Sequence, residues 1–187
     1  MTNTFYSENE LGKMGFGSYG NNVLISRKAS IYSPELISIG DSVRVDDFCI
    51  LSGKISLGSF IHISAYSALY GKFGIEMHDF SGLSPRCTVF SAADDFSGEY
   101  LVNPMISEKY RNVTGGKVII GKFVQVGTGS VIMPNTVINE GAAISAMSFV
   151  NKSIEEWTIA GGIPAKLIKV RSKEMANKAR LFISNLE

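Results

Sequence analysis

The sequence predicts an all-β fold, a parallel β-helix whose coils have three sides, and three observations predict it. Aliphatic residues recur at every sixth position from Ile120 to Val150, and again from Ile39 to Leu69. In the C-terminal run, the residue four positions after each of them is mostly small or β-branched. Glycine makes up 19 of the 187 residues, above the usual share of about 7%, which suits a chain with many tight corners. A period of six fits neither the 3.6-residue repeat of a helix nor the alternation of a continuous strand.

Each period of six corresponds to a short strand and a corner, and three periods make one coil. Stacked coils hydrogen-bond as a parallel sheet at roughly 4.8 Å per layer. A two-residue slip at 71–74 interrupts the register, and a fainter beginning of it is visible at Ile25 and Ile31. The pattern predicts about five coils, or about 24 Å of prism, with one inward column on each face. The columns are Ile39, Leu57, Met77, Ile120 and Ile138; Val45, Ile63, Leu83, Val126 and Ile144; and Leu51, Leu69, Val89, Ile132 and Val150.

The segments on either side of the repeat are expected to cap the prism. Residues 1–24 are predicted to form a helical cap, because Ser7 and Glu10 have the spacing of a capping box. The β-helix then occupies residues 25–170. Residues 172–187 are predicted to form a C-terminal helix with one apolar side. That side consists of Met175, Ala179, Leu181 and Phe182.

One long loop interrupts the β-helix. Between residues 91 and 117 the period fails for 27 residues. Loops of this length inside a compact domain are usually functional or disordered. The loop therefore supplies the candidate substrate contacts, which are Asp95, Glu99 and Tyr100. Asp-Asp before Phe-Ser-Gly also suits a simple turn.

Length and charge describe a single domain, residues 1–187, without a strong electrostatic preference. Eighteen Lys and Arg against 17 Asp and Glu leave a net charge of +1, so nothing calls for nucleic acid or an anionic membrane as a partner. No apolar run approaches the roughly 18 residues of a membrane span, and residues 1–10 lack the features of a secretory signal. We therefore expect a cytoplasmic protein.

Both cysteines are predicted to be structural. Cys49 and Cys87 each lie four positions after a column residue, so both point into the core as small apolar groups. They are two coils apart, roughly 9–10 Å, which is too far for a disulfide. Neither thiol is expected to act as a nucleophile.

The hexads, the long loop and the ending Val150-Asn-Lys-Ser-Ile154-Glu-Glu-Trp-Thr-Ile-Ala-Gly-Gly-Ile-Pro-Ala-Lys166 resemble those of the left-handed β-helix acyltransferases. Within that superfamily the chain is most similar to the galactoside/maltose O-acetyltransferase type and to sugar acetyltransferases of surface-polysaccharide gene clusters. The likeness covers residues 25–171. It implies a homotrimer with three active sites between subunits, and acetyl-CoA lying along the prism.

The resemblance also implies which residues hold acetyl-CoA. Corner residues would face the pantetheine arm, and lysines would lie near the phosphates. Gln125 occupies the place of an aromatic residue in some relatives. The alternative is that the corner residues are small only because corners are tight. The assigned residues are Gln125, Thr128, Ala146, Asn151, Lys152, Lys166 and Lys169.

Acetyl transfer to a hydroxyl needs a base and a donor for the developing oxyanion. Relatives carry a catalytic histidine early in the long loop, but the matching position here is Asp94. We therefore expect His62, which the register turns outward beside Ile63, to be the base, with Asp94 or Asp95 orienting its ring. His78 is the alternative base.

The sequence thus predicts an acetyl-CoA-dependent O-acetyltransferase that acts on a sugar hydroxyl. An alternative is N-acetylation of an amino-sugar nucleotide, for which an aspartate or a water chain could carry the proton. A non-catalytic trimeric scaffold is an alternative from another class, although the irregular outer positions speak against it. No metal is expected, because two histidines at different heights cannot supply a three-histidine zinc site.

Overall fold

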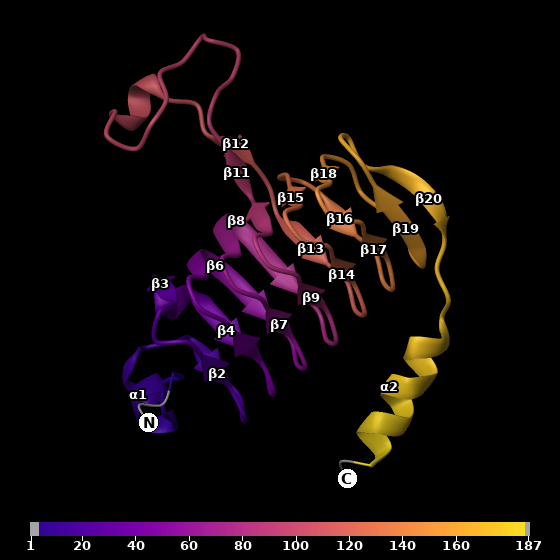
Figure 1. Cartoon of the computed structure of the whole chain (residues 1–187). Coiled ribbons are helices and arrows are strands. Elements are labelled where there is room, and N and C mark those ends of the chain that lie inside the picture. Colours follow the sequence, from indigo (N-terminus) through magenta and orange to yellow (C-terminus); the bar gives the residue numbers. More distant parts are fainter. Residues whose placement is uncertain (1–3, 186–187) are drawn as a thin grey trace.

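The computed structural model describes residues 4–185 and shows a three-sided solenoid (Figure 1). Short parallel strands stack along its axis in about seven turns, the architecture of a left-handed β-helix. The predicted fold class is confirmed, whereas the predicted height of about five coils is too small.

One face of the prism is a sheet of eight strands. Seven of them are parallel and lie one above another, and β20 (Lys166–Val170) pairs antiparallel with the last of these. The seven are β2 (Leu24–Ile25), β5 (Arg44–Val45), β7 (His62–Ile63), β9 (Gly82–Leu83), β14 (Gln125–Val126), β17 (Ala143–Ile144) and β19 (Thr158–Gly161).

The other two faces form one sheet of ten strands, because β6 (Ile50–Leu57) and β8 (Ala68–Met77) continue around a corner. On one face β6 and β8 are joined by β1 (Ser18–Tyr19), β4 (Ile37–Ile39), β13 (Val118–Ile120) and β16 (Val137–Ile138). On the other face they are joined by β3 (Ser30–Tyr32), β10 (Thr88–Phe90), β15 (Val131–Ile132) and β18 (Phe149–Val150).

The strand register confirms all three predicted columns. Ile39 lies opposite Leu57 and Leu57 opposite Met77, and this column continues upward in the same way. The columns that contain Val45 and Leu51 are equally continuous. No column side chain is more than 4% exposed, so the aliphatic side chains fill a dry interior.

The β-helix begins earlier than predicted, inside the range 1–24 that was expected to be a helical cap. The helix α1 covers only Glu8–Lys13, and its expected capping box is present, with the Ser7 backbone N–H donating to the Glu10 carboxylate at 2.8 Å. Strands β1 and β2 already pair with β4 and β5. The first three residues of the expected cap lie outside the described residues.

A two-residue insertion explains why the first coil was hard to see. Tyr19, Ile25 and Ile31 follow one another at intervals of six and pair with the next coil. The short 3-10 helix η1 (Pro34–Leu36) then lengthens the step from Ile31 to Ile39. This is the same kind of slip as the one at 71–74.

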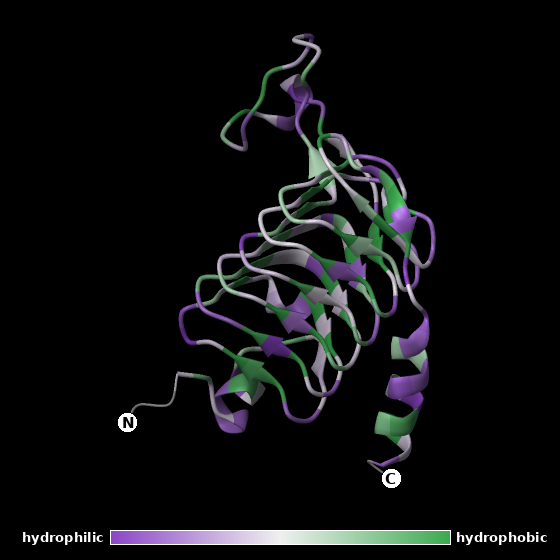
Figure 2. Ribbon diagram, turned by 45° about the vertical axis from the view of Figure 1, so that its right-hand side comes forward, coloured by the Kyte–Doolittle hydropathy of each residue, from purple (hydrophilic) through white to green (hydrophobic). Residues whose placement is uncertain are grey.

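Two appendages leave the prism. An arm spans the long loop, with an antiparallel stem of β11 (Ala92–Ala93) and β12 (Thr114–Gly115) and a 3-10 helix, η2 (Glu108–Tyr110), and Figure 1 shows it projecting away from the coils. The C-terminal helix α2 (Glu174–Ser184) turns an apolar side toward the prism (Figure 2). Residues 186–187 of the expected helix lie outside the described residues. Within residues 4–185, no helix is long and apolar enough to cross a membrane.

Candidate active site

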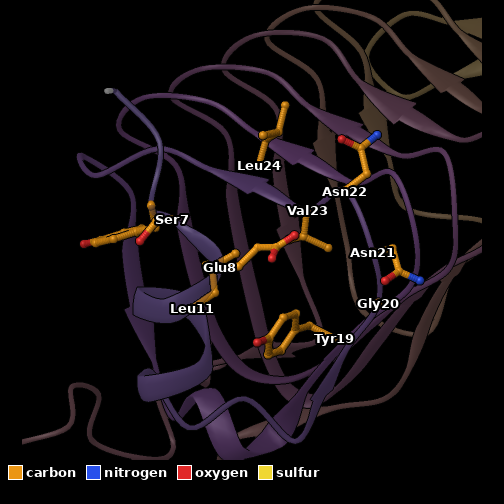
Figure 3. A pocket seen from close by; sticks show the side chains of 10 residues that line it. Ser7, Glu8, Leu11, Tyr19, Gly20, Asn21, Asn22, Val23 and Leu24 are labelled. Carbon is orange, nitrogen blue, oxygen red and sulfur yellow. The ribbon is translucent and has the colours of Figure 1, made fainter. Parts of the chain in front are cut away.

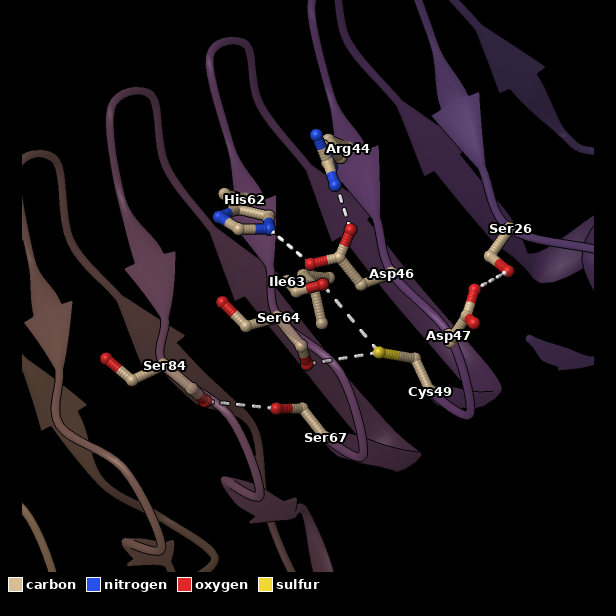
Figure 4. A network of polar contacts seen from close by, with 10 residues as sticks. All are labelled: Ser26, Arg44, Asp46, Asp47, Cys49, His62, Ile63, Ser64, Ser67 and Ser84. Carbon is tan, nitrogen blue, oxygen red and sulfur yellow. Dashed lines mark hydrogen bonds and ion pairs between the residues drawn. The ribbon is translucent and has the colours of Figure 1, made fainter. Parts of the chain in front are cut away.

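Charged side chains meet on the outer surface of the eight-stranded sheet (Figure 4). His62 Nε2 lies 2.7 Å from Asp46 Oδ2, and Arg44 Nε lies 2.7 Å from Asp46 Oδ1. Partial burial acts to raise the pKa of Asp46, but the hydrogen bonds from Arg44 and His62 outweigh it and the pKa lies below its usual value. An ionised carboxylate therefore holds the His62 ring in place.

Within the described chain Asp46, rather than the loop aspartate that was expected, pairs with His62. The parallel register puts Arg44 on β5 directly beside His62 on β7, and Asp46 follows β5 at the corner. The coil spacing contained this information: Arg44 and His62 are 18 residues apart, one full coil.

A second polar pair lies further along the same sheet: Ser84 follows β9, one layer beyond His62, and Gln125 lies on β14, two layers beyond it. Gln125 Nε2 donates to Ser84 Oγ at 3.1 Å. Gly82 stands between His62 and Gln125 in the outward column, and a Cβ there would lie 3.0 Å from Gln125 Oε1. The missing side chain thus gives Gln125 room to lie along the sheet toward Ser84. Figure 4 shows the Ser84 hydroxyl on the same outer side as His62.

Ser84 was not predicted as a site residue. It occupies the corner position that Ser64 and Ser145 also occupy in other coils. A serine at that position is ordinary in this chain, so only its contact with Gln125 distinguishes it.

The predicted cofactor residues lie on two corners and on the C-terminal hairpin. Thr128 and Ala146 are exposed in two successive coils, along the edge of the prism that carries Ser84. The two coils are joined there by a hydrogen bond from the Met147 backbone N–H to the Thr128 carbonyl at 2.8 Å. Asn151 and Lys152 are exposed at a different corner, after β18, and Lys166 and Lys169 are exposed on β20. The structure therefore brings Gln125, Thr128 and Ala146 together on one edge.

Asp94 is exposed on the arm, at a pocket of about 320 Å³. The other lining residues are apolar: Phe90, Ala92, Ala93, Phe96, Val113 and Met133. The carboxylate of Asp95 accepts hydrogen bonds from the Ser97 hydroxyl and the Gly98 backbone N–H, both at 2.9 Å. Asp95 thus closes a turn.

Within one chain the predicted site residues lie on different parts of the prism and on the arm. Ser84 and His62 belong to the edge of the eight-stranded sheet, Asp94 lies beyond β10 (Thr88–Phe90), and Glu99 and Tyr100 lie exposed further out on the arm. His78 is exposed on a third corner, where its backbone carbonyl accepts a hydrogen bond from the Ser81 hydroxyl at 2.6 Å.

Neither thiol can serve as a nucleophile. Cys49 and Cys87 are fully buried and free, and each donates to a backbone carbonyl at 3.2 Å. Burial raises the pKa of Cys49 to about 11 and also raises that of Cys87. In the described part of the chain, no three metal-ligating side chains gather.

A further hollow of about 550 Å³ lies between α1 and the first coil (Figure 3). Glu8, Leu11, Tyr19 and Asn21 are among its lining residues. None of the predicted site residues lines it, so the candidate site is the sheet edge and the arm.

No family model matches the chain, but similar proteins cover nearly all of it. It is 42% identical over 181 residues to the dTDP-4-amino-4,6-dideoxy-D-glucose acyltransferase of Escherichia coli, which covers 95% of this chain and 94% of that protein. It is 26% identical over 162 residues to the putative lipopolysaccharide biosynthesis O-acetyl transferase WbbJ of Escherichia coli strain K12, over 80% of this chain and 76% of WbbJ.

Among solved structures, the chain resembles AntD, an N-acyltransferase from Bacillus cereus. The two are 52% identical with a TM-score of 0.96, over 99% of this chain and 100% of AntD. AntD structures hold coenzyme A together with dTDP or dTDP-4-amino-4,6-dideoxyglucose, and several carry substitutions of its Ser84 or its Asp94. The chain therefore belongs to the left-handed β-helix sugar acyltransferases, and it is a coenzyme A-dependent acyltransferase.

Proposed function

We propose that the chain transfers an acyl group from acyl-CoA to the amino group of a dTDP-linked 4-amino-4,6-dideoxy sugar. The similarity to AntD over 99% of the chain carries this proposal, because AntD is an N-acyltransferase crystallised with such a sugar nucleotide. The predicted transfer to a hydroxyl is less well supported, since the O-acetyltransferase relative is only 26% identical.

Asp94 suits an amine acceptor. A neutral amine attacks a thioester without a strong base, and it then has one proton to lose while the thiolate of coenzyme A leaves. Asp94 is exposed at a pocket, and the family resemblance assigns it the place of the histidine in the galactoside-type O-acetyltransferases. We infer that the carboxylate of Asp94 binds the ammonium form of the acceptor and takes one proton from it, which gives the neutral amine that attacks. The proton that the nitrogen loses after attack passes to the departing thiolate. His62, held by Asp46, is the second candidate base.

Ser84 is the reason to include the edge of the eight-stranded sheet in the reaction site. AntD has been crystallised with its Ser84 or its Asp94 substituted. This chain also has a serine at position 84 and an aspartate at position 94. We infer that both side chains face the reacting groups. Because they lie on different corners of one chain, a site that contains both needs a second copy, as in a homotrimer with sites between subunits.

In such an assembly acyl-CoA would follow the edge toward the C-terminal end. Its pantetheine arm would pass the corners of Thr128 and Ala146, beside Gln125. Lys152, Lys166 and Lys169 would supply charge for its phosphates. All three lysines are exposed in the last coils and the hairpin that follows.

The deciding experiment compares an amine with the matching hydroxyl. The purified protein is given acetyl-CoA or 3-hydroxybutyryl-CoA with dTDP-4-amino-4,6-dideoxyglucose or with dTDP-6-deoxyglucose, and thiol release is followed. We expect kcat/KM to be at least about 100-fold higher for the amine, since the site is built for its charge and donors. A preference for the hydroxyl would show that the protein is an O-acyltransferase.

Two variants separate the candidate bases. Asp94→Asn should lower kcat by a factor of about 100 or more, the usual contribution of a positioned base. His62→Gln should change kcat much less. The opposite result would assign the base to His62.

A further inference from the structure

A cationic pocket adjoins the pocket of Asp94. It has a volume of about 230 Å³, and Lys72, Glu108, Arg111 and Val113 line it. Val113 also lines the pocket of Asp94. The two hollows therefore share Val113 as a wall.

Arg111 holds its guanidinium inside the arm with few partners. The side chain is only 14% exposed, and its Nε is enclosed without a hydrogen-bond partner among the described residues. The facing carboxylate is that of Glu108, whose Oε1 lies 3.9 Å from Nη2, too far for a hydrogen bond. The Glu108 side chain is itself 92% exposed, so it can swing into solvent.

An arginine that is covered, and that meets only one exposed carboxylate at 3.9 Å, is costly to the folded chain. Buried polar groups in native proteins are almost always hydrogen-bonded, and an exception calls for an explanation. The ordinary explanation for an enzyme is a ligand that completes the set. The positive charge of Arg111 favours an anion as that ligand.

Lys72 brings a second positive charge from a different element. It lies on β8 in the prism, whereas Arg111 follows η2 on the arm. The planar guanidinium suits two-point contact with phosphate oxygens, and the lysine adds a compact charge. Two cations against one exposed carboxylate favour a ligand with more than one negative charge.

We propose that this pocket binds the diphosphate of the nucleotide-sugar acceptor, with Arg111 and Lys72 as its phosphate ligands. This inference rests on the proposed function. A 4-amino sugar nucleotide carries its amine and its diphosphate at opposite ends of one ring. Two adjoining pockets, one with Asp94 and one with Arg111, match that arrangement.

The diphosphate of coenzyme A is the other candidate ligand, and its expected place is elsewhere. Lys72 follows the part of β8 that stacks under β10, β15 and β18, and Lys152 follows β18. Three layers correspond to about 14 Å along the prism. The two diphosphates would therefore occupy separate cationic sites.

The test measures Kd for dTDP, thymidine and coenzyme A by calorimetry on the full chain. Variants are Lys72→Ala, Arg111→Lys and Arg111→Ala. We expect each to raise Kd for dTDP about tenfold or more, the value of one charge-assisted hydrogen bond. Kd for thymidine and for coenzyme A should stay within about twofold.

Lys109→Ala is the matched control. It removes the same charge from η2, but Lys109 packs over the ring of Tyr110 at 4.6 Å and does not line the pocket. It should leave Kd for dTDP unchanged. Because Arg111→Ala could disturb the arm, Lys72→Ala and Arg111→Lys decide the outcome.

Unchanged binding of dTDP in both deciding variants would overturn the inference, and so would an equal loss of coenzyme A binding or a wild-type protein that does not bind dTDP. Failure of the proposed function alone gives a different result. The wild type would then acylate no amino-sugar nucleotide, but it would still bind dTDP, and Lys72→Ala and Arg111→Lys would still raise the Kd for dTDP.

Discussion

Cys49 shows how the interior of the prism sets the chemistry of a single group. Its Sγ lies 3.2 Å from the Ser64 carbonyl, and the side chain is fully buried. Burial penalises the thiolate and raises the pKa to about 11. The folded chain therefore binds this proton more tightly than the unfolded chain does.

This difference predicts a loss of stability in alkali. The contribution of Cys49 is complete below the usual thiol pKa of about 9 and is lost as the pH rises toward 11, by roughly 2 to 3 kcal/mol in total. Urea titrations between pH 8.5 and 11 should show a smaller fall in the free energy of unfolding for Cys49→Ala than for the wild type. Equal slopes would contradict the assignment. At pH 8 iodoacetamide should label neither cysteine until the protein is unfolded.

Arg171 fixes the C-terminal segment to the corners of the prism. Its Nη1 donates to the backbone carbonyls of Phe123 at 3.0 Å, Gly141 at 2.9 Å and Ala142 at 3.1 Å. Burial lowers the pKa of Arg171, but an arginine stays charged at any pH of interest. One cation thus serves two successive coils.

Arg171→Ala should be strongly destabilising, because it removes the charged donor that these three carbonyls share; among the described residues, only Ala142 has a further hydrogen bond, from the Gln125 backbone N–H at 3.2 Å. We expect the free energy of unfolding to fall by about 2 to 4 kcal/mol in urea titrations. Arg180→Ala, at an exposed position of α2, is the control and should change it by less than about 0.5 kcal/mol. Similar losses in both variants would mean that the three hydrogen bonds contribute little.

At the scale of elements, one corner of the prism carries an aromatic ladder. Phe60, Phe80, Phe123 and Trp157 follow one another with ring centroids 4.7, 5.5 and 6.1 Å apart. Each has a positive φ, and α2 packs against the ladder. Gly141 interrupts it between Phe123 and Trp157, since a Cβ there would lie 2.3 Å from the Trp157 ring.

Gly141→Ala should therefore cost more than an ordinary glycine substitution. The left-handed backbone at φ +69° costs about 1 kcal/mol for alanine, and displacing the indole adds a clash that brings the expected loss to about 3 kcal/mol. Gly15→Ala is the matched control: its φ is +77° and its Cβ would meet nothing within 4 Å. Urea titration of both variants gives the difference, and equal losses would show that Trp157 yields freely.

The elements that sequence could predict are those whose side chains must be buried. A column position such as Leu57 tolerates only an apolar residue that fits inside the coil, so the period of six is visible along the chain. Corner positions carry no such constraint. The ladder from Phe60 to Trp157 was missed for this reason, and the first coil was missed because η1 shifts its register.

In the candidate site, too, the exposed positions carry less information in the sequence than the buried ones do. Asp94 stays a prediction that comes from the family resemblance, because relatives carry a histidine at the matching place early in the loop. The pairing of His62 with Asp46, and of Ser84 with Gln125, depends on which side chains the coil spacing brings together on the outer surface. Many polar residues can occupy those positions, so composition gives no signal there.

At the scale of the whole molecule, two features of the described surface indicate contact with another copy of the chain. Ser84 and Asp94 lie on different corners, and the C-terminal hairpin exposes Ile163, Leu167 and Val170 by 68 to 78%. Contiguous exposed apolar side chains mark contact surfaces. Both features are explained if copies of the chain pack side by side and the arm of one reaches the sheet edge of the next.

Mixing two inactive variants tests this arrangement directly. Ser84→Trp should block the sheet edge and Asp94→Lys should reverse the charge on the arm, so each alone should lose activity. An interface between two randomly mixed copies is intact when an Asp94→Lys copy supplies Ser84 and a Ser84→Trp copy supplies Asp94. With equal amounts of both variants this holds for about a quarter of interfaces. After subunit exchange we expect about that fraction of wild-type turnover. Mixing either variant with the double variant should restore nothing, because every interface then lacks one of the two side chains. Turnover no higher than that of the separate variants, with an unchanged mass of the assembly, would place the whole site within one chain.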